Sequence, residues 1–117
     1  MTYLPGTHLV ATIEPADAAS INNYAIFQSR LNQLIDQYSL QKLGEVYHNF
    51  QPAGFTAVIC LSESHISIHT WPEYKLANLD IYLSNYQRSN DHTVTGIFDA
   101  LIQLFDAKIL HQQNISR

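Results

Sequence analysis

The segment from Leu61 to Glu73 carries the densest set of side chains that can do chemistry. It runs Leu-Ser-Glu-Ser-His-Ile-Ser-Ile-His-Thr-Trp-Pro-Glu and contains histidines, carboxylates and hydroxyls close together. Groups of these types bind metals, pair a nucleophile with its base, or react with the backbone beside them. Which of these is feasible depends on whether the segment is a helix or a strand.

The spacing of His65 and His69 first suggests a metal site. On a helix this spacing places two histidines on one face, as in zinc sites of the H-E-x-x-H type. Here Ile66 and Ile68 alternate with polar residues, which predicts a strand, and four residues of strand span about 13 Å. Zinc ligands each lie about 2 Å from the metal. One strand therefore cannot give both histidines to one ion. We expect no metal, and only sharing between two chains stays open.

A serine with nearby histidines also suggests a hydrolase. Ser64 is not in a G-x-S-x-G turn, however, and no carboxylate is placed to orient a histidine. By composition alone, residues 62–64 are most simply a polar turn before a strand, because serines are common in turns. The residue types by themselves do not assign a function.

The rest of the chain predicts alternating strands and helices. Runs of β-prone or alternating residues predict strands at 8–13, 43–50, 55–61, 64–70, 79–84 and 108–115. Two apolar stripes with helical spacing predict helices, with the positions Tyr24, Phe27, Leu31, Leu34, Ile35 and Tyr38 in one and Val94, Ile97, Phe98, Leu101, Leu104 and Phe105 in the other. We expect Ser20 or Asn22 to cap the first helix and Pro72 to end the fourth strand.

The order β-α-β-β-β-β-α-β, with short turns, predicts an α+β fold. We expect a two-layer α/β sandwich with a mainly antiparallel sheet and two helices on one face. No linker or repeat divides the sequence, so residues 1–117 are predicted to form a single domain. The other sheet face carries histidines and hydroxyls and is predicted to be a site or a dimer surface. Cys60 lies in an apolar strand and is expected to fill core.

Composition and charge narrow the class of partner. Hydrophobic residues make up 46% of the chain and charged residues 14%, which indicates a globular protein. Ten acidic residues against six basic ones give a net charge of -4, which argues against nucleic acid or an anionic membrane as partner. No apolar run approaches the ~20 residues of a membrane span, and no signal peptide is predicted. A single cysteine suits a reducing cytoplasm.

The motif Glu63-Ser64-His65 followed by His69-Thr70-Trp71-Pro72-Glu73 resembles the signature of the prokaryotic S-adenosylmethionine decarboxylase proenzymes. The upstream run Phe50-Gln51-Pro52-Ala53-Gly54-Phe55-Thr56 resembles that family too, as does Asp80. Length and element order agree over nearly the whole chain. Members of the family are pyruvoyl enzymes that cut themselves at the Glu-Ser bond. The resemblance therefore implies cleavage between Glu63 and Ser64.

The resemblance also implies a reaction sequence. The hydroxyl of Ser64 attacks the carbonyl of Glu63, β-elimination releases residues 1–63, and hydrolysis leaves a pyruvoyl group on residues 64–117. This self-generated cofactor forms a Schiff base with the substrate amine and accepts electrons as carbon dioxide leaves, as pyridoxal phosphate does elsewhere. The implied product is decarboxylated S-adenosylmethionine, the aminopropyl donor for spermidine synthesis.

Matching positions imply roles for three more residues. His69 is the processing base, and Thr56 stands where the family usually has a serine that assists processing. Ser84 stands where the family usually has the cysteine that donates a proton. A thiol has a pKa near ~8.5, whereas an aliphatic hydroxyl is a far weaker acid. The change from cysteine to serine at position 84 therefore removes an acidic group, whereas the change from serine to threonine at position 56 keeps the hydroxyl. The change at position 84 matters more for this reason.

Three residues are implied to bind substrate. Phe50 and Trp71 would stack on the adenine ring, and Glu73 would orient a substrate cation or hydroxyl. The alternatives are core or interface aromatics and a solvated charge.

The distance along one strand bears on oligomeric state. Ser64 and His69 lie about 16 Å apart on an extended strand, so one chain cannot easily bring them together. We expect a homodimer in which each site takes Ser64 from one protomer and Thr56 plus His69 from the other.

Two other functions stay open. The serine at position 84 leaves room for a pyruvoyl enzyme that decarboxylates arginine or ornithine. A non-catalytic paralogue that binds a ligand or regulates an active partner would show no self-cleavage.

Overall fold

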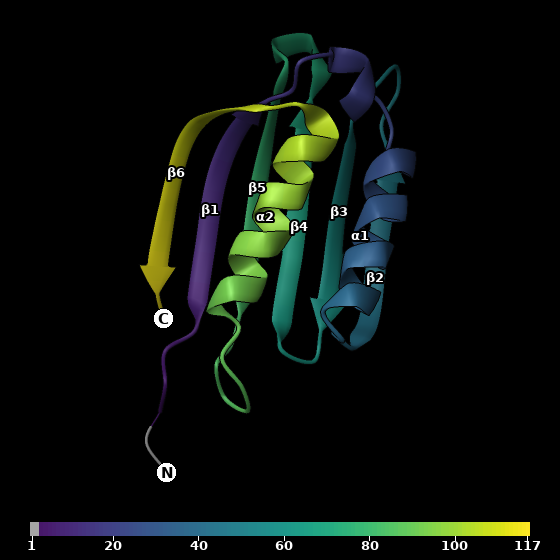
Figure 1. Cartoon of the computed structure of the whole chain (residues 1–117). Helices are drawn as coiled ribbons and strands as arrows, with labels where there is room; N and C mark the ends of the chain where they lie inside the picture. Colours follow the sequence, from purple (N-terminus) through teal and green to yellow (C-terminus); the bar gives the residue numbers. More distant parts are fainter. Residues whose placement is uncertain (1–2) are drawn as a thin grey trace.

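The protein is a six-stranded antiparallel sheet with two helices on one face, as Figure 1 shows. The structure is a computed structural model that describes residues 3–117. The strands and helices, in chain order, are β1 (Thr7–Glu14), α1 (Ala25–Gln37), β2 (Lys42–Asn49), β3 (Phe55–Leu61), β4 (Ser64–Trp71), β5 (Leu76–Leu83), α2 (Asp91–Phe105) and β6 (Lys108–Ser116). Short 3₁₀ turns at Ala18–Ile21 and Pro72–Tyr74 complete the chain. The predicted α+β fold and element order are confirmed.

The strand order across the sheet is β2-β3-β4-β5-β1-β6, and each neighbouring pair is antiparallel. Strands β2 to β5 follow one another as a meander, whereas β1 lies between β5 and β6. The first strand of the chain is therefore enclosed by two of the last, and β4 lies inside the sheet between β3 and β5.

Alternation along each strand separates a core face from an outer face. In β4, Ile66 and Ile68 are fully buried beneath the helices, while His65 and His69 point the other way. The predicted helical stripes are buried as expected, through Phe27, Leu31, Leu34 and Ile35 of α1 and Val94, Ile97, Phe98, Leu101 and Phe105 of α2. Apolar burial of this kind stabilises by about 1.5–3 kcal/mol for each large side chain.

The start of the first helix differs from the prediction. Asp17 caps a 3₁₀ turn by accepting the Ala19 N–H at 3.0 Å, and the Ser20 hydroxyl donates back to the Asp17 carbonyl at 2.7 Å. Asn22 ends that turn, so neither predicted residue caps α1. Instead, the Asn23 side chain accepts the Ala25 N–H at 3.0 Å. The sequence holds several capping residues in a row, and the 3₁₀ turn uses the earlier ones.

The outer face of the sheet, the one turned away from both helices, is only partly covered. It exposes apolar side chains such as Val46 and Val58 beside half-buried polar ones such as His8, His65 and Tyr82. Neither helix of residues 3–117 is long and apolar enough to cross a membrane.

Candidate active site

The turn between β3 and β4 holds the expected cleavage point in a strained conformation. Ser62 and Glu63 form the turn, and Ser64 begins β4 with φ at 134°. Positive φ in this range favours glycine, because a Cβ there meets the adjacent backbone. Such strain costs about 1–3 kcal/mol and persists only where the surroundings hold it. The structure therefore stores strain in the residue whose bond is expected to break.

The carbonyl oxygen of Glu63 faces a hydrogen-bond donor. The Ser84 N–H donates to it at 2.8 Å, extending the β4–β5 ladder one step beyond the Ser64–Leu83 pair. An N–H in this position stabilises negative charge that develops on the oxygen when the carbonyl is attacked. A cavity of about 390 Å³ beside it is lined by Glu63, Ser84 and Tyr86, among others. Ser84 therefore lies next to the bond that is expected to be cut.

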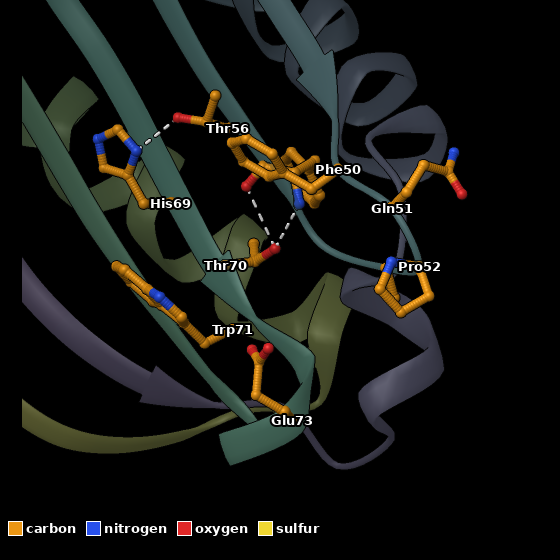
Figure 2. A pocket seen from close by; sticks show the side chains of 10 residues that line it. Phe50, Gln51, Pro52, Thr56, His69, Thr70, Trp71 and Glu73 are labelled. Atoms are coloured by element: carbon orange, nitrogen blue, oxygen red, sulfur yellow. Dashed lines mark hydrogen bonds between the residues drawn. The ribbon is translucent and has the colours of Figure 1, made fainter.

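At the other end of β4, Thr56 and His69 form a pair. They are direct partners in the β3–β4 register, and the Thr56 Oγ1 lies 2.5 Å from the His69 Nδ1 (Figure 2). This contact fixes the ring orientation and leaves Nε2 free to act on a further group. The sequence-based pairing of these two residues is thus reproduced in space.

Beside this pair lies a pocket of about 360 Å³ that contains the three predicted substrate-binding residues (Figure 2). Phe50 is 47% exposed and Trp71 is 40% exposed, so neither is a core aromatic of this chain. Glu73 lines the same pocket. Aromatic faces bind flat rings and cations, and a carboxylate accepts hydroxyls or pairs with positive charge.

The loop that carries Phe50 is held closed by backbone contacts. The Phe50 N–H donates to the Gly54 carbonyl at 2.8 Å, and the Gly54 N–H donates to the Asn22 carbonyl at 2.8 Å. Gly54 has φ at 101°, and a Cβ there would lie 3.2 Å from the Pro72 ring. Glycine at this position thus allows the loop to approach Pro72 and close one wall of the pocket.

The Thr70 side chain fixes the backbone beside the pocket. Its buried hydroxyl accepts the Phe55 N–H at 2.8 Å and lies within hydrogen-bond distance of the Phe55 carbonyl (Figure 2). The same hydroxyl donates to the Ile21 carbonyl at 3.1 Å. Replacing it with valine keeps the shape and leaves these buried groups unpaired. We expect Thr70→Val to lower the free energy of unfolding by about 1–3 kcal/mol in urea titrations. Thr95→Val, on the exposed side of α2, should change it by less than ~0.5 kcal/mol; equal effects would contradict the anchoring role.

The candidate residues therefore fall into two groups within one chain. Ser64 and Ser84 lie at the start of β4, and Thr56, His69 and the aromatic pocket lie near its end. The two groups are about 16 Å apart along the strand. What they share is the outer face, where a shallow cavity of about 570 Å³ is lined by both Ser64 and His69.

Cys60 is not the core residue that we expected. It is exposed on the outer face and lines the same shallow cavity as Ser64. The alternation of β3 explains the error, because Ala57, Ile59 and Leu61 face the helices and the residues between them must face outward.

Aromatic and imidazole rings gather on the outer face near Ser64. His8 lies 6.0 Å from His65 and 5.2 Å from Tyr82, measured between ring centres. Burial lowers the pKa of His8, opposed by the nearby Asp80 carboxylate. This imidazole is therefore held toward its neutral form.

Sequence reasoning missed two residues at the cleavage point. Arg88 and Asn90 both hydrogen-bond to the Glu63 carboxylate. They belong to the polar run between β5 and α2, whose spacing carries no motif; only the contact in space reveals them.

In residues 3–117, no group of three or more histidine, cysteine, aspartate and glutamate side chains is arranged to hold a metal ion.

Comparisons with known proteins find relatives in sequence and in fold. The "S-adenosylmethionine decarboxylase proenzyme" of Archaeoglobus fulgidus is 40% identical over 77 residues, covering 66% of this chain and 69% of that protein. The Aquifex aeolicus proenzyme of the same name is 38% identical over 96 residues, covering 79% and 71%. The crystal structure of the adenosylmethionine decarboxylase from Aquifex aeolicus matches with a TM-score of 0.80 at 28% identity, covering 99% of this chain and 91% of that one.

Fold and site thus define an enzyme of the decarboxylase class. The sequence model described as "S-adenosylmethionine decarboxylase" matches residues 7–117. The chain belongs to the S-adenosylmethionine decarboxylase family.

Proposed function

We propose that this protein is a self-processing, pyruvoyl-dependent decarboxylase that converts S-adenosylmethionine to its decarboxylated form for spermidine synthesis. The observation that carries the proposal is the strained backbone of Ser64, φ 134°, directly after a Glu63 carbonyl that accepts the Ser84 N–H. A bond of this kind is prepared for attack by its own neighbouring hydroxyl.

Self-cleavage would use groups that this chain itself supplies. The Ser64 Oγ adds to the Glu63 carbonyl carbon while the Ser84 N–H stabilises the oxygen, and the C–N bond breaks to leave an ester and a free amine. A base then removes the α-proton of residue 64, and the ester carboxylate leaves with residues 1–63. Loss of ammonia by hydrolysis completes the ketone. We assign that base to His69, as the family resemblance implies, because the contact with Thr56 orients its ring.

Substrate binding would fall to the pocket at the other end of β4. Phe50 and Trp71 are open to stack on adenine and to face a sulfonium cation, and Glu73 is available to a ribose hydroxyl or a positive charge. The pyruvoyl group supplies the electron sink for loss of carbon dioxide. Ser84, whose N–H contacts the carbonyl that precedes residue 64, would pass a proton to the product carbon.

The test is the mass of fresh protein under denaturing conditions, combined with carbon dioxide release. We expect two polypeptides, residues 1–63 and 64–117, with a pyruvoyl cap on the second and release from S-adenosylmethionine. Release from arginine or ornithine instead would keep the cofactor and replace the substrate, an outcome that the serine at position 84 makes worth measuring. A chain that stays whole in all conditions would favour a non-catalytic paralogue.

The serine at position 84 should limit turnover. A thiol gives up a proton near neutrality far more readily than an aliphatic hydroxyl. Because a well-placed general acid contributes about 10²–10⁴-fold, we expect Ser84→Cys to raise kcat per pyruvoyl chain at least about tenfold. The fraction of cleaved chain is measured beside kcat, so that processing and turnover are separated. An unchanged kcat would show that protonation is not limited by this residue.

We also propose that the working unit is a homodimer with two shared sites. Two observations support it: Ser64 and His69 lie at opposite ends of β4, and the face that carries both exposes apolar and imidazole side chains. A reducing cytoplasm suits the exposed thiol of Cys60.

A further inference from the structure

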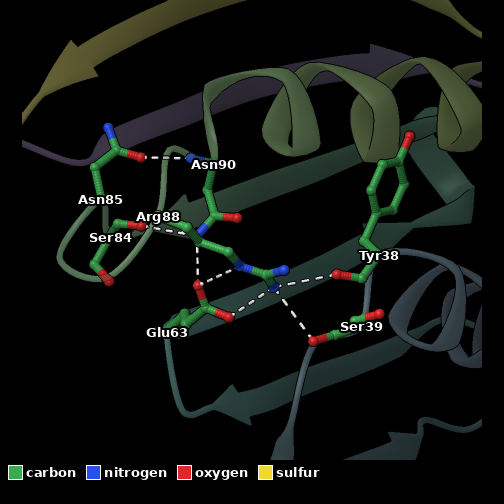
Figure 3. Close-up of polar contacts among 7 residues, drawn as sticks. All are labelled: Tyr38, Ser39, Glu63, Ser84, Asn85, Arg88 and Asn90. Atoms are coloured by element: carbon green, nitrogen blue, oxygen red, sulfur yellow. Dashed lines mark hydrogen bonds and ion pairs between the residues drawn. The ribbon is translucent and has the colours of Figure 1, made fainter.

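The side chain of Glu63 accepts hydrogen bonds from two residues that take no part in the cleavage chemistry itself. The Arg88 Nη2 lies 2.9 Å from Oε1, and the Arg88 Nε lies 3.1 Å from Oε2 (Figure 3). The Asn90 Nδ2 donates to Oε2 at 2.6 Å. A two-point contact between guanidinium and carboxylate fixes direction as well as distance. The orientation of the Glu63 side chain is therefore set from two sides.

Arg88 and Asn90 are themselves held in place by the ends of the helices. The Arg88 Nη2 also donates to the Tyr38 and Ser39 carbonyls, at 3.1 Å and 3.2 Å, where α1 ends. A positive charge is favourable at the C-terminal end of a helix. Asn90, which is 1% exposed, directly precedes α2. The turn that carries the scissile bond is thus tied to the ends of both helices.

Asn90 also bridges Glu63 and Ser84. Its Nδ2 donates to the Ser84 carbonyl at 2.9 Å as well as to the Glu63 carboxylate (Figure 3). The N–H of the same Ser84 donates to the Glu63 carbonyl. The contacts therefore hold the attacked carbonyl and its donor in one rigid arrangement.

The turn sequence does not specify this geometry without help. Two-residue hairpin turns are favoured by glycine and asparagine at positive φ, whereas this turn is Ser-Glu and the positive φ falls on Ser64. A strained residue persists only when its surroundings hold it. The contacts to Glu63 supply that restraint one residue before the strain.

Charge gives a second reason for the contacts. Hydrogen bonding to Arg88 lowers the pKa of Glu63, burial opposes the shift, and Asn90 adds to it. The side chain is therefore held as a carboxylate, and an unpaired carboxylate would oppose negative charge developing on its own carbonyl oxygen. Pairing with Arg88 offsets that repulsion.

We propose that Arg88 and Asn90 are positioning residues for self-cleavage, which hold Glu63 so that its carbonyl meets the Ser64 hydroxyl and the Ser84 N–H. This inference rests on the proposed self-processing function and assigns these residues to its first step, formation of the ester. Arg88 is not expected to take part in decarboxylation, because it contacts only Glu63 and the end of α1, and Glu63 lies on the opposite side of the scissile bond from the residue that carries the pyruvoyl group.

The test follows cleavage of newly folded chain over time. Arg88→Met keeps a side chain of similar length and removes the guanidinium group that contacts Glu63. We expect cleavage to slow by about 10–100-fold, as for a misplaced reacting group. Arg30→Met, whose guanidinium contacts Gln33 on the surface of α1, should cleave like the native chain. The fraction of Arg88→Met that does cleave should decarboxylate at the native rate per pyruvoyl chain.

Hydroxylamine identifies the step, because it cuts an accumulated ester but not an amide. We expect it to leave Arg88→Met whole, whereas restored cleavage would overturn assignment to ester formation. Equal rates for native and Arg88→Met would overturn the proposal itself.

If Arg88→Met does not fold, Glu63→Gln carries the same test, because the amide cannot form the charge pair with Arg88. Native-like cleavage of Glu63→Gln contradicts the proposal. A native chain that never cleaves instead refutes the proposed function.

Discussion

Replacing Ser64 with alanine is expected to leave the polypeptide whole and to abolish decarboxylation. Alanine has no oxygen to attack the Glu63 carbonyl, so neither the ester nor the ketone derived from it can form. Without an electron sink, decarboxylation should fall to background, a loss of roughly 10⁶-fold or more.

The measurement must denature the protein, because the cut alone would not separate the products. Three of the five strand pairings, β3–β4, β5–β1 and β1–β6, join residues 1–63 to residues 64–117. The native mass therefore stays nearly constant after cleavage, whereas the denatured mass splits. Ser62→Ala, which removes the other hydroxyl of the same turn, serves as the matched control and should cleave normally. Decarboxylation by an uncut Ser64→Ala chain would contradict the proposed cofactor.

Periodicity was enough to predict most of the fold. Alternation in β4, with Ile66 and Ile68 against His65 and His69, settled its strand character and excluded a helical metal site. The helical stripes of α1 and α2 are buried where the spacing places them. These features follow from local geometry, which the sequence carries directly.

Other features depend on contacts that no local pattern encodes. The start of α1 depended on which of several capping residues the 3₁₀ turn would use. The exposure of Cys60 required knowing which face of β3 meets the helices. The contact between Arg88 and Glu63 joins residues that are 25 positions apart in the sequence. It forms only because the β5–α2 loop returns to the β3–β4 turn. The strain at Ser64 is likewise imposed by its surroundings and not by residue type.

Complementation between two inactive chains should restore cleavage in one of them. Within a chain, Ser64 and His69 lie at opposite ends of β4, yet both line the outer face. If two copies pack these faces about a twofold axis, the start of β4 in one meets the end of β4 in the other. A Ser64→Ala chain can then supply His69 to the intact Ser64 of a His69→Ala chain.

The heterodimer is made by producing both chains together with different tags and purifying through both. We expect only the His69→Ala chain to be cut, at least about tenfold faster than in its own homodimer, since a general base contributes about 10²–10⁴-fold. A partner with both substitutions, Ser64→Ala and His69→Ala, folds with the same outer face but lacks the imidazole, and it should give no rescue. Were the His69→Ala chain to stay whole beside Ser64→Ala, the base would have to come from the same chain, and β4 could not remain extended between the two residues during processing.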